Sequence, residues 1–492
     1  MPRLLMVSLT VLLLPAFAGA QPTRELQILQ DGLRKVIDDA QPSIACILVS
    51  RSERYRDFNA LSGGPEGRLG GFDARPLNTA FADPSRKDLL RRLDLANPDP
   101  LPESYGSGVV IDASGLILTN FHVVQNATKI FVRLPGVAGS YADILAADGR
   151  SDLAVLKLIS PPANLKPLRF GEGQLARKGD FVVGLANPFA AGFRDGGATA
   201  THGIIGNLRR KAPLATPEND RGRTLHHLGT LMQTDLRLNV GCSGGAVLNM
   251  DGEMIALTNS MAAVIGGDAP GGFAVPLTPG IKRIIEVLKR GEEVEYGFLG
   301  VGVDNLNAFE RAGAVIDLVS EGTPARRAGL AVGEIITAVN NVPIRDYDEL
   351  FLEVGTAMAG SEIALKVLSF GNRTRSVNVR LAKFQYPGPV IATRRPAAVH
   401  GLRIDYGSVA SADVPLPEGV YIRDVDRGSP AEAKLKELLE RGRWIITSVN
   451  GKPTPTPVDF YREAGLGRGP LELRIVEVAR NAEATARSVT LP

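Results

Sequence analysis

Hydrophobic and polar positions divide this 492-residue chain into segments with different expected structures. Apolar residues three and four positions apart over 24–41 predict a helix, and the apolar run Ser43–Ser50 predicts a strand. From Tyr105 to Pro276, short apolar runs alternate with turns rich in Gly, Asn and Asp, which is typical of a β-sandwich or β-barrel. Residues 278–290 return to helical spacing with basic residues at the C-terminal end, so a helix is expected to close this first unit.

Two segments depart from these patterns. Residues 1–20 carry Arg3, then an apolar run, then the small residues Ala18-Gly19-Ala20. This order predicts a secretory signal peptide; a membrane anchor is the alternative, but the run of about 15 residues is shorter than the roughly 20 that a spanning helix needs. Residues 51–104 are rich in Arg, Asp, Gly and Pro, and they predict a long exposed loop.

The C-terminal part contains a repeat. The repeated blocks are GTPARRAGL (322–330) with EIITAVNNVPI (334–344), and later GSPAEAKL (428–435) with WIITSVNGKPT (444–454). The period is too long for a solenoid, so we predict two tandem domains over 296–384 and 397–492. The segment 385–396 between them contains several prolines and predicts a linker.

Composition excludes several classes of function. The 56 basic and 53 acidic residues leave a net charge of +3, which gives no electrostatic footprint for nucleic acid. Two cysteines are too few for a disulfide scaffold or a cysteine-built zinc site. Because no nucleotide or metal motif is present, we expect no cofactor and no metal.

The strongest chemical signal is the pentapeptide GCSGG at 241–245. Its glycines allow Ser243 to lie on a tight turn, with backbone N–H groups free to approach a substrate carbonyl. His122 follows a predicted strand in LILTNFHVV, and Asp152 precedes an alternating strand in SDLAVLKL. Serine, histidine and aspartate are the nucleophile, base and orienting carboxylate of an activated hydroxyl, here in the chain order of two-barrel serine proteases.

The segments around these residues resemble the HtrA (DegP/Do-like) family of exported serine proteases. The matching blocks are TNFHVV, SDLAVLKL, QTDLRLNVGCSGGAVLNMDGEMIAL, GLANPF, THGIIG and GGFAVP. The resemblance implies a mainly β fold, with a chymotrypsin-like double β-barrel protease domain over 21–290 followed by two α+β PDZ domains.

The resemblance also implies a role for individual residues. His122 would be the general base, Asp152 would orient it, and Ser243 would be the nucleophile. The N–H groups of Gly241 and Ser243 would form the oxyanion hole. Leu238 and Asn259 would belong to the substrate pocket, with Leu238 near its floor and favouring small aliphatic side chains.

Cys242 departs from the family, which usually has Asn before the serine. It is either a small tolerated side chain that affects the oxyanion loop or its redox sensitivity, a cysteine nucleophile, or a partner of Cys46 in a disulfide. Because two glycines directly follow Ser243, Ser243 is in register to be the nucleophile. Cys46 lies in the first predicted strand and Cys242 at the barrel junction, so their Cα atoms are expected beyond the roughly 7 Å limit for a disulfide.

Two further histidines, His226 and His227, lie in the basic segment 207–230. A metal or phosphate site is one interpretation of this cluster. The interpretation that we favour is a solvated regulatory loop, because loops in this part of the barrel control the active site in the family.

PDZ domains bind the ends of chains by adding a strand to an exposed sheet edge. In the first unit, Phe298, Leu299, Gly300 and Val301 match the carboxylate-binding loop. In the second unit, Leu402 and Ile404 follow a single glycine, Gly401, so this unit either binds peptide or only packs and spaces.

These features predict a periplasmic or secreted, ATP-independent serine endopeptidase that hydrolyses misfolded or unfolded proteins. The expected partners are unfolded polypeptide substrates, C-terminal peptides at the PDZ domains and further copies in a homotrimer or larger homo-oligomer. Neither nucleic acid nor a stable membrane anchor is expected. The alternative is a catalytically impaired PDZ-containing binding or chaperone protein, and an esterase for small substrates is a third interpretation.

Overall fold

The computed structural model describes residues 23–51, 104–136, 139–211, 224–260, 271–303, 313–371, 373–410, 416–465, 469–478 and 485–492. The predicted signal peptide and almost all of the predicted loop 51–104 lie outside these residues. Among the described helices, none is both long and apolar enough to cross a membrane.

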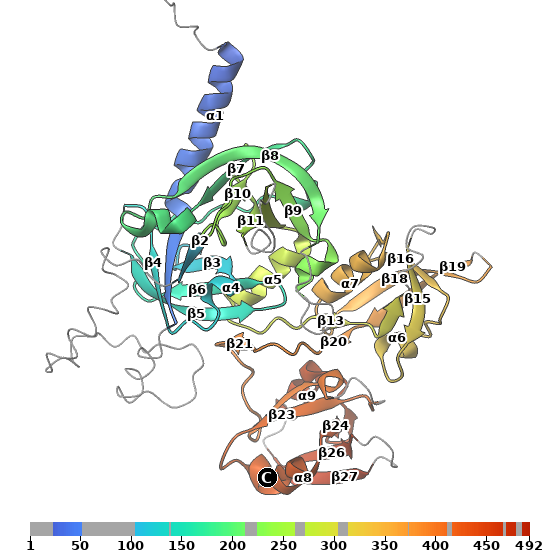
Figure 1. Ribbon diagram of the computed structural model, residues 1–492. Helices are drawn as coiled ribbons and strands as arrows, with labels where there is room; N and C mark the ends of the chain where they lie inside the picture. The colour runs from blue at the N-terminus through green and yellow to red at the C-terminus, as the bar shows by residue number, and fades with distance from the viewer. Residues whose placement is uncertain are drawn as a thin grey trace, which may run out of the picture.

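Two β-barrels lie side by side in the N-terminal part of the described chain (Figure 1). The first barrel has the order β5-β4-β1-β2-β3-β6, and pairing of β5 with β6 closes it. Its strands are β1(Ile44–Ser50), β2(Ser104–Asp112), β3(Leu116–Asn120), β4(Lys129–Arg133), β5(Ser140–Asp148) and β6(Leu153–Leu158). The second barrel is closed in the order β10-β11-β12-β9-β8-β7. Its strands are β7(Phe181–Ala186), β8(Thr199–Arg210), β9(Leu231–Thr234), β10(Ala246–Leu248), β11(Met254–Asn259) and β12(Gly272–Pro276).

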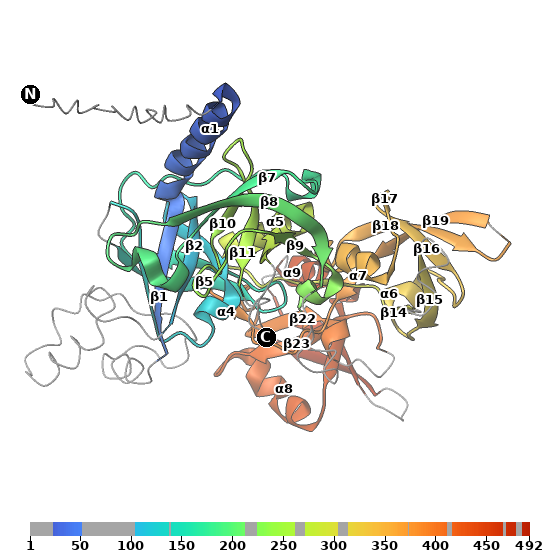
Figure 2. The same ribbon diagram turned by 45° about the horizontal axis from the view of Figure 1, so that its top comes forward.

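Both helices predicted for this part of the chain are confirmed. Helix α1(Arg24–Ala40) projects from the barrels before the short turn η1(Gln41–Ser43), and Leu26 and Ile28 at its outer end are exposed (Figures 1 and 2). Helix α5(Pro279–Lys289) begins at Thr278, whose hydroxyl accepts a hydrogen bond from the Ile281 amide. Its position against both barrels makes it part of the protease core rather than of the units that follow.

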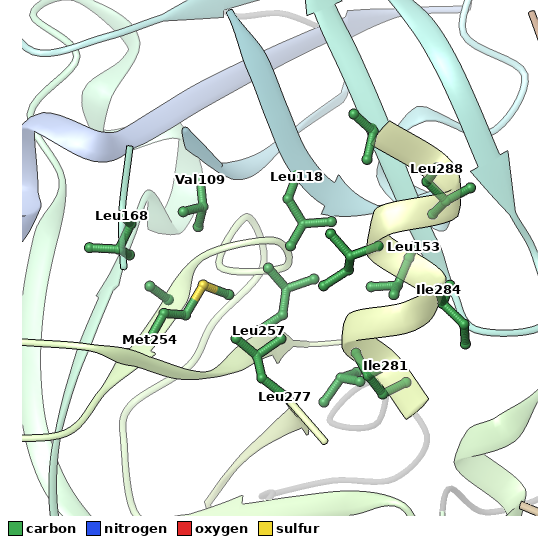
Figure 3. Close-up of a cluster of buried hydrophobic side chains, with 14 of the residues drawn as sticks. Val109, Leu118, Leu153, Leu168, Met254, Leu257, Leu277, Ile281, Ile284 and Leu288 are labelled. Carbon is green, nitrogen blue, oxygen red and sulfur yellow. The ribbon is translucent and has the colours of Figure 1, made fainter. Parts of the chain in front are cut away.

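The core between the barrels is apolar. Helix α5 directs Ile281, Ile284 and Leu288 toward Leu118 and Leu153 of the first barrel (Figure 3). Leu257, Leu277 and Met254 close the same cluster from the second barrel (Figure 3). Full burial of such a side chain stabilises the fold by roughly 1.5–3 kcal/mol. This shared core fixes the two barrels relative to each other, and with them the residues at their junction.

The first C-terminal unit has a sheet with the order β14-β15-β16-β18-β19, in which β14 is an edge strand. Its strands are β14(Val301–Val303), β15(Ala314–Val319), β16(Ile335–Val339), β17(Val342–Pro343), β18(Glu362–Ser369) and β19(Arg373–Arg380), and its helices are α6(Pro324–Arg327) and α7(Tyr347–Thr356). The chain enters and leaves this unit through two paired strands, β13(Gly297–Phe298) and β20(Ala382–Lys383).

The second C-terminal unit repeats this topology, with the order β22-β23-β24-β26-β27 and β25 paired to β24. Its strands are β22(Leu402–Tyr406), β23(Val420–Val425), β24(Trp444–Val449), β25(Lys452–Pro453), β26(Leu471–Glu477) and β27(Ala486–Leu491), its helices α8(Pro430–Arg441) and α9(Pro457–Gly465), and its short turn η8(Gly407–Val409). The sequence repeat therefore corresponds to a repeated fold.

The segment 385–396, predicted as a linker from its prolines, lies against the first barrel. Within it, β21(Ile391–Ala392) pairs with β5, with Ile391 opposite Ala147 and Ala392 opposite Ala146. The Thr393 amide extends this contact by donating to the Leu145 carbonyl at 3.1 Å. Figure 1 shows β21 passing beneath the barrel before the chain enters the second unit.

Candidate active site

His122 and Asp152 form a direct pair at the junction of the barrels. His122 lies on the single-turn helix α4(Phe121–Val124), immediately after β3, and Asp152 lies immediately before β6. Because β3 pairs with β6, with Asn120 opposite Leu153, the two side chains meet. His122 Nδ1 lies 2.7 Å from Asp152 Oδ2, and the His122 amide donates to Asp152 Oδ1 at 2.9 Å.

The carboxylate of Asp152 is buried and the imidazole is not. The side chain of Asp152 is 4% exposed, whereas that of His122 is 21% exposed. The Asp152 carbonyl accepts hydrogen bonds from the Asn120 side chain at 3.1 Å and the Phe121 amide at 3.0 Å. This arrangement orients the ring of His122 while leaving part of it accessible, as a general base requires.

Ser243 lies on the turn between β9 and β10, where Gly241 and Gly244 have φ angles of 95° and 87°. Its carbonyl accepts from the Ser107 amide at 2.8 Å, so β2 of the first barrel holds this turn of the second. Its hydroxyl accepts from the Ser260 amide at 3.0 Å, and no hydrogen bond joins it to His122 within the described residues. These two hydrogen bonds hold the serine in place, and its hydroxyl must rotate to reach the base.

The backbone of this turn leaves two donors available. The Cys242 amide donates to the Asn239 carbonyl at 3.0 Å, and Ser107 Oγ donates to the Gly241 carbonyl at 2.7 Å. The amides of Gly241 and Ser243 donate to no protein acceptor in the described part of the chain. Two such N–H groups beside a serine hydroxyl can stabilise the oxyanion of a tetrahedral intermediate.

Comparisons with known proteins agree with this geometry. Residues 106–257 match the family model of the trypsin-like peptidase domain, and residues 315–368 match that of the PDZ domain. The "Periplasmic pH-dependent serine endoprotease DegQ" of Escherichia coli is 32% identical over 67% of this chain and 69% of its own. The chain belongs to the DegP/DegQ (HtrA) family. It is a serine protease of the trypsin-like class.

Two other relatives match different shares of this chain. The "Probable periplasmic serine endoprotease DegP-like" of Brucella suis is 28% identical, and the match spans 88% of this chain and 84% of that protein. The "Probable periplasmic serine protease do/HhoA-like" of Haemophilus influenzae is 34% identical, over 56% of this chain and 58% of that protein. The Brucella match, which spans 88% of this chain, extends into both C-terminal units.

Cys242, the residue before Ser243, is buried. The residue is 2% exposed, its Sγ accepts from the Asn239 amide at 3.4 Å, and burial raises the pKa of its thiol. Burial likewise raises the pKa of Cys46 to about 12. Both cysteines are free, so the structure contains no Cys46–Cys242 disulfide. A buried thiol with a raised pKa is a poor nucleophile, which favours Ser243.

The two residues expected in the substrate pocket lie in different surroundings. Leu238 is half-buried at the edge of the second barrel, with its side chain against Gly272. Asn259 is 2% exposed at the end of β11, and its Nδ2 donates to Asp152 Oδ2 at 3.1 Å. Asn259 therefore contacts the Asp152 carboxylate, and its place in the substrate pocket stays a prediction.

His226 differs from the solvated loop that the sequence predicts. It lies on the turn η6(Leu225–Leu228) and is 3% exposed, with Nε2 4.0 Å from Asp152 Oδ2 and 3.5 Å from Asn259 Nδ2. Its neighbour His227 accepts from the Thr224 amide at 3.0 Å and so caps the turn. The expectation of a solvated loop is wrong for His226. The neighbouring Leu225 packs in the apolar core, so this turn is buried. Among the described residues no cluster fits a metal ion.

The burial of His226 predicts a pH-dependent stability. Burial lowers its pKa from 6.5 to about 4, an effect that Asp152 opposes and that His227 and His122 reinforce. Below pH 6.5 the unfolded chain binds a proton here that the folded chain does not, so stability falls as the pH decreases toward 4. We expect His226 to contribute a loss of about 2 kcal/mol between pH 7 and 5, or about 4–8 °C in thermal midpoint.

Calorimetry at both pH values would measure this loss. In His226→Gln the protease transition should shift less between pH 7 and 5 than in the wild type. His202→Gln is the control, because His202 is exposed on β8. Equal shifts in the wild type and His226→Gln would contradict the prediction.

Some of the residues expected to bind peptide lie on an edge strand, and others are buried in the core. In the first PDZ unit, Val301 begins the edge strand β14, and Gly300, with φ 89°, packs its backbone against Thr323. Leu299 is buried in the core, and the rings of Phe298 and Phe384 lie with centroids 6.4 Å apart, tilted by 53° to each other. In the second unit, Leu402 and Ile404 belong to the edge strand β22 and are both buried.

Proposed function

We propose that this protein is an exported endopeptidase for unfolded proteins, with His122, Asp152 and Ser243 as its catalytic triad. The observation that carries the proposal is the 2.7 Å pair of His122 and Asp152 beside a serine turn with two available amides. The buried carboxylate fixes the tautomer in which Nδ1 carries the proton and Nε2 accepts one.

The reaction follows from these positions. Substrate binding brings a peptide carbonyl over Ser243, and rotation of the hydroxyl away from the Ser260 amide directs it to His122 Nε2. His122 takes the proton as Ser243 attacks, and Asp152 stabilises the resulting imidazolium. The amides of Gly241 and Ser243 receive the oxyanion. His122 then protonates the leaving amine, and water hydrolyses the acyl-enzyme by the same steps in reverse order.

The first PDZ unit supplies the peptide-binding edge in this proposal. In the described sheet β14 is an edge strand, which is the position that strand addition requires, and helix α7 packs against β13, the strand that leads into it. In the second unit, the Ile404 amide on β22 donates to the hydroxyl of Tyr461 at 3.4 Å. The repeat aligns Tyr461 of α9 with Phe351 of α7, which has no hydroxyl. Peptide capture is therefore assigned to the first unit, and the second serves mainly in packing and spacing.

The proposal includes export and assembly. The pattern of residues 1–20 supports a signal peptide, and the periplasmic names of the relatives support the same destination. The exposed Leu26 and Ile28 on the projecting helix α1 support contact between copies in a homotrimer or larger oligomer.

Labelling with an alkyl fluorophosphonate, which reacts with activated serines, tests the nucleophile. We expect the probe on Ser243 of residues 21–492, located by mass spectrometry, and cleavage of casein by the same sample. Ser243→Ala should lose both, whereas Ser160→Ala, a substitution in an exposed turn of the first barrel, should lose neither. Casein cleavage that persists in Ser243→Ala but disappears in Cys242→Ala would contradict the assignment.

A further inference from the structure

The turn 148–152 carries Asp152 and is unusually well anchored. Both the amide and the hydroxyl of Ser151 donate to Asp148 Oδ2, at 2.7 and 2.6 Å. Asp148 is 8% exposed, and desolvation raises the pKa of its carboxyl. Asp152 itself has φ 55°, so its side chain direction depends on how this turn is held.

Arg150, at the centre of the turn, lies between two aromatic rings. Its Cζ is 4.4 Å from the ring centroid of Tyr296 and 4.0 Å from that of Phe384. The residue is 8% exposed, and its Nη1 has no hydrogen-bond partner within the described chain. The rings therefore provide much of what holds this buried cation in place.

Both rings belong to the stem of the first PDZ unit, by which we mean Tyr296, β13, β20 and Phe384. The Phe384 amide donates to the Tyr296 carbonyl at 2.8 Å, and β13 pairs with β20. The Tyr296 hydroxyl also donates to Asp148. The stem thus contacts the turn through a hydrogen bond and through the enclosed guanidinium.

A second path connects the same turn to helix α7 of the PDZ unit. The Arg150 carbonyl accepts from the Leu225 amide at 2.8 Å, at the start of η6. Turn η6 packs against α7 of the first PDZ unit. Arg209 pairs with Asp346 at 3.2 Å and Glu349 at 3.1 Å, and Lys211 pairs with Asp348, so α7 is fixed to the barrel beside η6.

We propose that Arg150 is a positioning residue for Asp152, through which the stem of the first PDZ unit sets the geometry of the His122–Asp152 pair. Movement of the stem would withdraw the rings from a buried cation and would shift the turn, since Arg150 is two residues from Asp152. A displacement of about 1 Å in a catalytic group can lower a rate by about 100-fold. The inference rests on the proposed role of Asp152.

The experiment compares kcat and KM of the wild type and its variants for hydrolysis of a fluorescent peptide. The final extent of fluorophosphonate labelling gives the concentration of active sites in each sample. Arg150→Met retains bulk but loses the charge, and Phe384→Leu removes one ring. We expect each to lower kcat about 10- to 100-fold with little change in KM. Arg150→Lys, which keeps a cation between the rings, should recover most of the rate. Arg150→Met and Phe384→Leu both remove the contact between the guanidinium and the Phe384 ring. The kcat of the double variant should therefore be only slightly lower than that of Arg150→Met.

Arg283→Ala is the matched control. Arg283 Nε donates to the Thr356 carbonyl at 2.9 Å, so it joins α5 to the PDZ unit without touching the turn 148–152. It should lower the thermal midpoint but leave kcat unchanged. An unchanged kcat in Arg150→Met, an equal loss of kcat in Arg283→Ala, or the absence of rescue by Arg150→Lys would overturn the inference. Activity retained by Ser243→Ala in the same assay would instead refute the proposed function.

Discussion

Replacing Asp152 by Asn is expected to reduce kcat for peptide-bond hydrolysis by about 10⁴-fold. Asp152 Oδ2 accepts from both His122 Nδ1 and Asn259, and Oδ1 accepts from the His122 amide. The carboxylate is the acceptor in each of these three hydrogen bonds. In either orientation, the NH2 group of the introduced asparagine would face at least one of these donors. The substitution also removes the negative charge that stabilises the imidazolium of His122. The loss is measured as the rate of hydrolysis of a fluorescent peptide, divided by the concentration of folded protein.

Asp180→Asn is the control for this experiment. Asp180 Oδ2 accepts from the Arg177 amide in an exposed turn of the second barrel, so the same chemical change occurs away from the site. Its kcat should equal that of the wild type. If Asp152→Asn kept more than about a tenth of the wild-type kcat, His122 would not depend on this carboxylate for its orientation and charge.

Gly241→Ala should lower kcat by about 10²- to 10³-fold, the usual effect of losing one oxyanion donor. A Cβ at this position, where φ is 95°, would lie 2.7 Å from the Asn187 carbonyl oxygen and 3.0 Å from the Phe189 amide nitrogen. Both neighbours are backbone atoms and cannot rotate away. The turn must therefore shift, and the Gly241 amide leaves the position that the oxyanion requires. Steady-state kinetics on the same peptide would show the loss in kcat more than in KM.

Gly252→Ala separates crowding from backbone strain. Gly252 has φ 74° in the turn between β10 and β11, and a Cβ there would meet no atom within 4 Å. Both substitutions impose the strain of a positive φ on alanine, but only Gly241→Ala crowds the oxyanion turn. We expect a small decrease in thermal midpoint from Gly252→Ala with unchanged kcat. A similar loss of kcat in both variants would show that strain alone disables the enzyme.

The sequence predicted the parts of this protein that depend on local pattern. Helical spacing located α1 and α5, and repeated blocks located the two C-terminal units. The structure also brings His122 and Asp152 together from segments thirty residues apart, because β3 and β6 pair in the register that the barrel requires. A family pattern of residue types and chain order was sufficient for this, without knowledge of that register.

Other features depend on tertiary contacts that no local pattern expresses. His226 lies in a basic segment, and only the packing of η6 shows that it is buried beside Asp152. The hydrogen bond from Asn259 to Asp152 depends on the position of Asn259 at the end of β11. In the sequence, Arg150 has no feature that distinguishes it from other turn residues. Its enclosure by Tyr296 and Phe384, which are far away in the sequence, is visible only in the structure. In each case the partner comes from another segment, so the residue alone gives no signal.

The pairing of β21 with β5 limits the reach of the second C-terminal unit. The chain remains attached to the barrel up to Arg394, whose amide donates to the Gly291 carbonyl, and Val399 already belongs to the second unit through its contacts with Leu402. Only residues 395–398 are left as a tether, which spans at most about 14 Å when fully extended. If the ion pairs of Asp405 with Lys383 and of Arg423 with Glu293 opened, the unit would pivot close to the barrel wall rather than search the surroundings. The second unit would therefore rotate about a short hinge near the barrel, and it could not reach substrates far from the protease domain.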